Sequence, residues 1–250
     1  MSKKAKKTLL VGDTTRLEAV ANHPIMKLAP QVLNLDLEDP AGLTVEPFGF
    51  IIDLNLDEEE FERLDLYYDA PDAIVLGCAV KESLARMFVA MDDLPPFDLF
   101  GLNAFPTFVD KPIWEISALD PDKLSRLTDI LQPLGIGINI VQDQIGMVTP
   151  RVVCQIINEA YFMWQEGSAS REDIDMAMKL GVNYPYGPFE WAGRIGIEHV
   201  YQTLVNLGME LNPSVYRVSG ALAREYYRTF RPRPRFDPMN TLLNLGGFAN

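Results

Sequence analysis

The stretch GSASREDIDMAMKLG at residues 167–181, with YPYGPFEW at residues 184–191, carries the strongest folding signals of this chain. A helix is predicted just before it, because Thr149 is a plausible N-cap and Pro150 suits the first helical position. Gly167 is expected to end that helix as a left-handed cap. Between these limits, apolar side chains recur with the spacing of one helical face, at Val152, Val153, Ile156, Ile157, Ala160, Tyr161 and Trp164.

The quoted stretch also predicts two further helices. Ser170 and Asp173 resemble a capping box in which Asp replaces Glu or Gln, and Gly181 is expected to close the helix they open. Gly187 ends the next turn, and Pro188 begins a third helix. Such caps serve any pair of packed helices, so on physical grounds alone this is a helical module with no chemistry of its own.

The residue pattern is more specific than the caps. GxASxEDIDxAMKLGxxYPxGPFE, residues 167–190, resembles the C-terminal helical domain of the 3-hydroxyacyl-CoA dehydrogenase family, which includes 3-hydroxybutyryl-CoA dehydrogenases. The resemblance is strong over residues 140–210. It implies a Rossmann domain, an all-helical dimerisation domain and an acyl-CoA cleft between them. We therefore expect an α/β plus α fold: a degenerate Rossmann-like, doubly wound parallel sheet over residues 1–142, followed by helices over residues 143–250.

Length, composition and charge agree with two domains in one soluble chain. The 250 residues are 48% hydrophobic, enough to bury a sizeable core. The formal net charge of −13 argues against nucleic acid or an anionic membrane as a partner. The basic start at residues 3–7 precedes an apolar run too short for a signal peptide, and Cys78 and Cys154 are interpreted as free buried thiols. We predict a cytoplasmic protein without a metal site.

Strands and helices are expected to alternate before residue 142, as in a parallel, doubly wound sheet. The expected strands span residues 8–12, 32–36, 48–53, 73–76, 113–116 and 135–141, and the expected helices span 14–22, 57–66 and 83–91. The charge run in the second of these helices is interpreted as a solvated face.

The candidate cofactor residues are Gly12 and Asp36. Gly12 ends the first strand, where a dinucleotide-binding protein carries Gly-x-Gly-x-x-Gly, but Thr14 and Leu17 replace the second and third glycines. Asp13 adds a negative charge beside the expected diphosphate position. Asp36 ends the second strand, where the family's acid binds ribose hydroxyls, although Asp is also a common turn former. NAD is therefore implied by the resemblance only, and the substitutions argue against its normal binding.

A second departure concerns coenzyme A. The resemblance implies a long, lysine-containing helical hairpin that helps to hold this group. Only residues 38–47 occupy the corresponding interval, and they contain no basic cluster. A phosphate clamp for coenzyme A is therefore not visible.

The candidate catalytic residues are Asn103 and Glu115. Residues 100–107, FGLNAFPT, resemble the family's Gly-Leu-His-Phe-Phe-Asn-Pro, with Asn103 in place of the catalytic His. Residues 113–116 resemble the strand whose glutamate orients that His, so Glu115 is retained. Asn does not titrate near neutral pH, and loss of a positioned general base costs roughly 10²–10⁴ in rate.

Two more segments depart from the family. Pro150-Arg151 replaces an Asn-Arg pair that contacts substrate, and residues 78–82 have lost most of the small hydroxyl residues expected near the nicotinamide. Of the two histidines, His23 is expected in a solvated loop, and His199 is expected to pack or face solvent within a helix. Neither belongs to a segment aligned with the active site.

The C-terminal part predicts two more helices. One spans residues 197–207 and closes at Gly208, and the other spans residues 213–230 with Asn212 as its cap. The aromatic side chains of the second helix are expected in core or dimer packing: Tyr216, Tyr226, Tyr227 and Phe230. Residues 231–235, RPRPR, are too rich in proline to stay helical and are interpreted as a surface tail.

Three functional hypotheses follow. The first is a family member that has lost NAD-dependent hydride transfer and acts by binding or assembly, as a homodimer through its helical domain or as a partner subunit. The alternative is an active 3-hydroxyacyl-CoA (3-hydroxybutyryl-CoA) dehydrogenase of fatty-acid metabolism, with Glu115 as base and Asn103 as hydrogen-bond donor. The third is a sensor for some other small ligand in the interdomain cleft, where the resemblance also allows acyl-CoA.

Overall fold

The computed structural model describes residues 7–58, 60–89 and 95–230. Within them, a seven-stranded sheet has the order β2-β1-β3-β4-β5-β6-β7. Its strands are β1 (Lys7–Gly12), β2 (Gln31–Asn34), β3 (Phe48–Asp53), β4 (Ile74–Cys78), β5 (Asp98–Leu102), β6 (Ile113–Ala118) and β7 (Gly137–Ile140). The helices around the sheet are α1 (Thr14–Val20), α2 (Glu60–Tyr67), α3 (Leu84–Val89) and α4 (Leu124–Leu131), with short 3₁₀ turns such as η2 (Pro40–Gly42) and η3 (Leu56–Glu58).

The predicted doubly wound, mainly parallel sheet is confirmed, with one unpredicted strand, β5, and one antiparallel pairing. β1 to β5 pair in parallel, whereas β6 runs antiparallel to β5 and β7 is parallel to β6. The connection from β5 to β6, residues 103–112, contains turns but no helix. A parallel crossover usually needs a longer connection with a helix, so this segment returns the chain antiparallel instead.

The sheet ends at β2 because the chain passes from β2 directly to β3. The interval predicted to lack the coenzyme A hairpin, residues 38–47, contains only the 3₁₀ turn η2. Dinucleotide-binding folds have a further strand beyond this position, in the order 3-2-1-4. The shortened interval therefore leaves β2 at the edge of the sheet.

The centre of the sheet is apolar because helices or loops cover both of its faces. Every residue of β4 and β5 is buried, the continuous pattern expected of internal parallel strands. Gly77 in β4 allows close packing, because a Cβ at this position would overlap the side chain of Leu56 in η3. The turn η3 is thereby held against the carboxyl end of β4.

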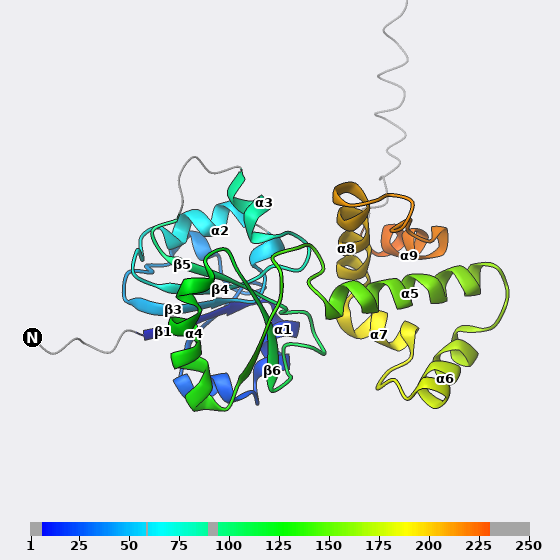
Figure 1. The fold of residues 1–250 in the computed structure, drawn as a ribbon, viewed down its shortest axis with the longest axis horizontal. Coiled ribbons are helices and arrows are strands. Elements are labelled where there is room, and N and C mark those ends of the chain that lie inside the picture. The colour runs from blue at the N-terminus through cyan, green and yellow to red at the C-terminus, as the bar shows by residue number, and fades with distance from the viewer. Residues whose placement is uncertain (1–6, 59, 90–94, 231–250) are drawn as a thin grey trace, which may run out of the picture.

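The second half of the chain consists of helices beside the sheet (Figure 1). They are α5 (Thr149–Gln165), α6 (Arg171–Val182), α7 (Pro188–Ile195), α8 (Ile197–Glu210) and α9 (Gly220–Phe230). α5 packs against the other four helices through a buried face that includes Val153, Ile157 and Tyr161. The boundary predicted between residues 142 and 143 lies between β7 and α5 and stays a prediction.

The cap predictions in the quoted stretch are mostly confirmed. Gly167 follows α5 with a φ of 75°. The Ser170 hydroxyl accepts a hydrogen bond from the Asp173 amide at 3.1 Å, and α7 begins at Pro188. The expected end of α6 at Gly181 is wrong by two residues, because Asn183 adopts the left-handed conformation with a φ of 57°.

The two last helices differ from the prediction. α8 continues through the predicted stop at Gly208 to Glu210, and residues 213–219 are not helical. The buried side chain of Asn158 in α5 explains the second error. Its Nδ2 donates to the Arg217 carbonyl at 3.0 Å, and its Oδ1 accepts from the Ser219 amide at 2.8 Å. These long-range bonds hold residues 217–219 away from helical geometry, and α9 starts only at Gly220. The predicted tail at 231–235 lies outside the described residues.

Both cysteines are free and buried, as predicted. Across the described ranges, none of the helices is long and apolar enough to cross a membrane. The same part of the chain has no group of three or more His, Cys, Asp or Glu residues placed to hold a metal ion.

Candidate functional site

Asn103 and Glu115 lie together on two neighbouring strands. Asn103 directly follows β5, Glu115 lies in β6, and the antiparallel pairing brings them side by side. The Nδ2 atom of Asn103 donates a hydrogen bond to Oε2 of Glu115 at 3.3 Å, and the Asn103 amide donates to the Glu115 carbonyl at 3.1 Å. The residue pair identified from the sequence is therefore assembled.

The Glu115 carboxylate caps helix α5. The Thr149 amide donates to both carboxylate oxygens, at 3.1 and 3.2 Å, and the Thr149 hydroxyl also donates to Oε1. The prediction that Thr149 is itself the N-cap is wrong, because Thr149 is the first helical residue. A carboxylate at a helix N-terminus is stabilised by the unpaired amides and the helix dipole. Glu115 thus joins the sheet to the helical half.

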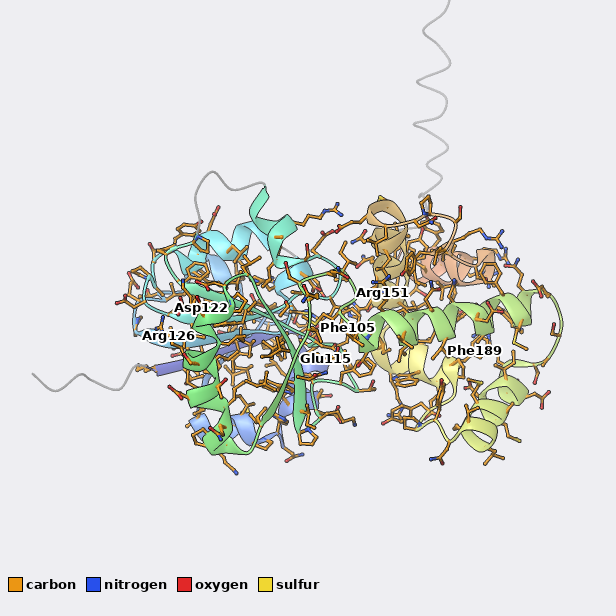
Figure 2. All side chains as sticks on the ribbon, viewed as in Figure 1. Phe105, Glu115, Asp122, Arg126, Arg151 and Phe189 are labelled. Carbon is orange, nitrogen blue, oxygen red and sulfur yellow. The ribbon has the colours of Figure 1, made fainter. Side chains whose placement is uncertain are left out.

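The side chain of Arg151 contacts Tyr216 in the helical half. Its Nε donates to the Tyr216 hydroxyl at 2.7 Å, and its guanidinium lies over the Tyr216 ring, 5.2 Å from the centroid. Figure 2 shows Phe105, Glu115 and Arg151 where the sheet meets the start of α5. Pro150 has no side-chain amide, and Arg151 is bound to Tyr216 within the helical half. Neither residue therefore supplies the substrate-contacting amide that the resemblance implies at this position.

The amides at the start of α1 are bound by the chain's own carboxylates. Asp36 accepts from the Thr14 amide at 2.8 Å, and Asp13 accepts from the Arg16 amide at 2.8 Å. The bond from Thr14 lowers the pKa of Asp36, which strengthens its anionic character. Gly12 is also closely packed, because a Cβ there would lie 3.3 Å from Leu17. The two predicted cofactor residues, Gly12 and Asp36, flank this loop, but a carboxylate holds the amide that a diphosphate would use.

The same arrangement recurs along the carboxyl edge of the sheet. Asp57 accepts from the amides of Val80 and Lys81 at 2.9 and 2.8 Å, in the loop after β4. Asp143 accepts from two amides at the start of α3, at 2.9 and 2.8 Å. The prediction of a solvated charge run is wrong for Asp57, which is 3% exposed. Since these carboxylates already satisfy the amides and repel anions, the residues present do not fit a dinucleotide diphosphate.

A buried arginine fills the space between this edge and α8. Arg16 has no exposed surface; its guanidinium donates to the Leu54 carbonyl at 2.7 Å and pairs with Glu58 at 2.8 Å. It also lies 3.4 Å from Nε2 of His199, whose ring stacks on Phe105 at a centroid distance of 5.2 Å. Figure 2 places Phe105 at this junction. Residues from α1, η3 and α8 thus meet where a cleft is expected.

The two acid–base groups of this cluster are held in fixed charge states. Burial, followed by the nearby charges of Arg16 and Lys81, lowers the pKa of His199 to about 3. Burial raises the pKa of Glu58, but the charges of Arg16 and Lys81 outweigh it and lower the value to about 2. At neutral pH the cluster therefore contains a neutral imidazole and a carboxylate.

Sequence reasoning missed this cluster. Arg16 stands four residues before the buried Val20 in a short amphipathic helix, and that i, i+4 spacing was the available signal that it faces inward. His199 is buried, and packing within a helix was one of the two environments predicted for it. The prediction for His23 is wrong, because its ring stacks on Trp114 at 4.7 Å and its Nε2 lies 3.0 Å from the Lys111 carbonyl.

A cavity of about 510 Å³ lies beside the cluster, between the turn η3, the loop after β4 and helices α8 and α9. Acidic and aromatic side chains form much of its wall, including Asp57, Glu58, Glu82, Glu198, Tyr201 and Tyr226. Asn103 and Glu115 do not line this cavity. The predicted catalytic pair and the interdomain cavity are therefore separate features of the chain.

Sequence comparison matches the helical half to a known domain. A family model described as 3-hydroxyacyl-CoA dehydrogenase, C-terminal domain, matches residues 146–229. The 3-hydroxyadipyl-CoA dehydrogenase of Escherichia coli (strain K12) is 41% identical over 102 residues, covering 40% of this chain and 22% of that protein. The probable 3-hydroxybutyryl-CoA dehydrogenase of Bacillus subtilis (strain 168) is 40% identical over 201 residues, covering 68% of this chain and 66% of that protein. The chain thus spans less than two thirds of these relatives' own length.

Solved structures share the whole architecture. The (S)-3-hydroxybutyryl-CoA dehydrogenase PaaH1 from Ralstonia eutropha superposes with a TM-score of 0.69 and 19% identity, covering 91% of this chain and 95% of that one. FadB2 of M. tuberculosis gives a TM-score of 0.68 and 17% identity, covering 90% and 94%. These likenesses show the fold, a Rossmann-like sheet followed by helices. The sequence matches show that the chain belongs to the 3-hydroxyacyl-CoA dehydrogenase family.

Proposed function

We propose that this family member has lost NAD-dependent hydride transfer and acts by binding or assembly. The observation that carries the proposal is the set of carboxylates on the amides where a dinucleotide would bind, above all Asp36 on Thr14 at 2.8 Å. A diphosphate would have to displace these carboxylates and then lie beside their charges. Arg16 and His199 also fill the adjoining space with paired, buried side chains.

The residues at the expected reaction centre support the same proposal. Asn103 cannot take a proton near neutral pH, and the carboxylate beside it is engaged with Thr149 as the cap of α5. Loss of a positioned general base lowers a rate by roughly 10²–10⁴. The pair therefore supports a structural connection between sheet and helices better than it supports proton transfer.

Assembly is proposed to use the helical half. Met176, Leu180 and Val182 of α6 are 56%, 80% and 54% exposed, and large apolar side chains grouped on a surface commonly mark an interface. We propose a homodimer that buries this part of α6, in a protein of the cytoplasm. The two buried, free cysteines fit a reducing compartment.

The test is NADH oxidation by acetoacetyl-CoA with purified protein. Glu115→Gln is the test variant and Glu159→Gln, on the exposed face of α5, is the matched control. We expect wild type and both variants to show the same background rate. Turnover in wild type and Glu159→Gln that disappears in Glu115→Gln would overturn the proposal, since a contaminating host enzyme would be unaffected by either change.

The alternative is an active 3-hydroxyacyl-CoA dehydrogenase of fatty-acid metabolism. The contact between Asn103 Nδ2 and Glu115 Oε2 at 3.3 Å favours it, because the geometry of the family's paired residues is kept. In this alternative Glu115 takes the substrate's hydroxyl proton, and Asn103 donates to the developing carbonyl oxygen. The same turnover assay decides between the two functions.

A further inference from the structure

A short connection, residues 141–148, joins the sheet half, residues 7–140, to the helical half, residues 149–230. Two such halves usually open by backbone rotation at a few connecting residues. Here the connection is held against the sheet half, because the Gly146 amide donates to the Val80 carbonyl at 2.7 Å. The connecting residue with the greatest conformational freedom is therefore already bound.

Two further features restrict the connection. Asp143 accepts hydrogen bonds from two amides at the start of α3 and from the Ser117 hydroxyl, the last at 3.2 Å. Ile145 and Met147, on either side of Gly146 in the sequence, are both buried. Backbone rotation here would break hydrogen bonds and expose apolar side chains. The connection is therefore poorly suited to act as a hinge.

Helix α7 contacts the sheet half through Trp191. Its indole N–H donates to the hydroxyl oxygen of Thr107 at 2.9 Å, and its ring lies 5.9 Å from that of Phe108. Thr107 has a φ of 75°, a strained conformation for a β-branched residue. Such conformations persist only where the surrounding structure holds them. The contact with Trp191 is one that holds Thr107 in place.

Helix α8 contacts the sheet half at two places along its length. His199 lies 3.4 Å from the fully buried guanidinium of Arg16 and stacks on Phe105. Two turns further on, the Asn206 side chain donates to the Lys81 carbonyl at 2.9 Å. A rotation about the connection that preserved the nearby cap of α5 would still break the contacts of α7 and α8.

We propose that these contacts lock the two halves into one unit that does not open. The cavity of about 510 Å³ between them is then of fixed size, and it admits only ligands that fit this volume. Small-molecule sites usually have volumes of about 300–1,000 Å³. The lock goes beyond the proposed function, because it limits motion and ligand size whether or not hydride transfer is retained.

Native-state hydrogen exchange, followed by NMR residue by residue, measures the lock. The amides of Gly146 and Thr149 donate to Val80 and Glu115 in the sheet half, so opening of the junction exposes them to exchange. The amide of Leu76, in the buried strand β4, reports global unfolding. We expect the protection factors of Gly146 and Thr149 to lie within about tenfold of that of Leu76.

Asp173 is the control for ordinary exchange at the start of a helix. Its amide is bonded to Ser170 at the exposed start of α6, away from the junction, and should be less protected than that of Thr149. Two results would overturn the lock. One is a Thr149 amide no better protected than that of Asp173. The other is junction amides protected about a hundredfold less than Leu76, since the halves would then open while the sheet stays folded.

Asn206→Asp is designed to release the lock at α8. The side-chain Nδ2 of Asn206 donates to the Lys81 carbonyl and, at 3.0 Å, to Oε1 of Glu82, and a carboxylate there would be repelled by both oxygens. Asn212→Asp is the matched control. It adds the same charge at an exposed residue after α8 and can still accept the hydrogen bond that the Ser214 amide donates at 2.9 Å.

The two variants give different expected patterns of exchange. Asn206→Asp should lower the protection factors of Gly146 and Thr149 by about tenfold more than that of Leu76, whereas Asn212→Asp should leave all three unchanged. An equal fall at all three amides in Asn206→Asp would mean that the contact supports folding alone. That result, or unchanged protection at the junction, would reject the lock.

Discussion

At the scale of single residues, Glu58 and His199 surround the fully buried guanidinium of Arg16. Arginine stays charged at any physiological pH, so its burial requires a partner of opposite charge, which Glu58 supplies at 2.8 Å. His199 remains neutral beside it because its pKa is about 3.

His199 gives the chain a specific sensitivity to acid. Its pKa is about 3 when folded and 6.5 in the unfolded reference, so between these values only the unfolded chain binds the proton. Stability is therefore lost as the pH falls below about 6.5. From pH 7 to pH 5 we expect this residue alone to lower the free energy of unfolding by about 2 kcal/mol.

Urea unfolding of wild type and His199→Gln at pH 7 and pH 5 measures this effect. The loss of unfolding free energy between the two pH values should be smaller in the variant by about 2 kcal/mol. His23, whose pKa burial also lowers, acts in the same direction but is present in both proteins. An equal loss in wild type and variant would mean that His199 titrates normally in the folded chain.

Asn103→His tests whether the missing base alone accounts for the proposed loss of activity. The new imidazole would stand beside Glu115, where Asn103 Nδ2 is now 3.3 Å from the carboxylate. We expect no NADH oxidation above the wild-type background, because Asp13 and Asp36 still hold the amides of α1. A rise of tenfold or more in the acetoacetyl-CoA assay would show that cofactor binding is intact.

At the scale of elements, Glu115 has a structural role as the cap of α5. Its carboxylate fixes the start of α5, the helix against which the rest of the helical half packs. We expect Glu115→Gln to lower the free energy of unfolding by about 1 kcal/mol, because an amide oxygen is a weaker cap than a carboxylate. The matched variant Glu159→Gln should change it by less than about 0.5 kcal/mol. The midpoints of urea unfolding are measured for wild type and both variants. Equal stabilities of Glu115→Gln and wild type would refute the capping role.

Elements fixed by local chemistry could be predicted, and those fixed by distant contacts could not. The starts at Ser170 and Pro188 follow from residues within one turn, so the sequence alone sufficed. Residues 213–219 carry a helical start signal, but Asn158, far away in the sequence, binds their backbone and overrides it. The reversal of β6 was missed because the strand before the helix-free connection at residues 103–112 was not predicted.

In the candidate site, too, some residues could be placed from the sequence and others could not. The resemblance pairs Asn103 with Glu115, but strand β5, which places Asn103 beside β6, is not among the expected strands. Asp57 could not be recognised as buried, since it lies in an acidic run that resembles a solvated helix face. Its burial depends on the amides of Val80 and Lys81, which only the folded sheet brings to it.

At the scale of the whole molecule, the exposed apolar side chains of α6 predict the oligomeric state. Leu180 is 80% exposed, and we expect Leu180→Glu to convert a dimer into a monomer by placing a charge in the interface. Leu37→Glu is the matched control, because Leu37 is 79% exposed but follows β2 on the sheet half. Light scattering coupled to size-exclusion chromatography gives the mass of each. A monomeric wild type, or a dimer that survives Leu180→Glu, would reject this interface.

The arginine at the centre of the molecule also bears on how such a chain can evolve. Removing Arg16 leaves the partly exposed Glu58 with Lys81 at 3.4 Å, whereas removing Glu58 leaves the fully buried guanidinium without its closest carboxylate. Leaving one member of a buried ion pair alone typically costs about 3–5 kcal/mol, a large part of a domain's stability. We therefore expect Arg16 and Glu58 to be replaced together more readily than one at a time.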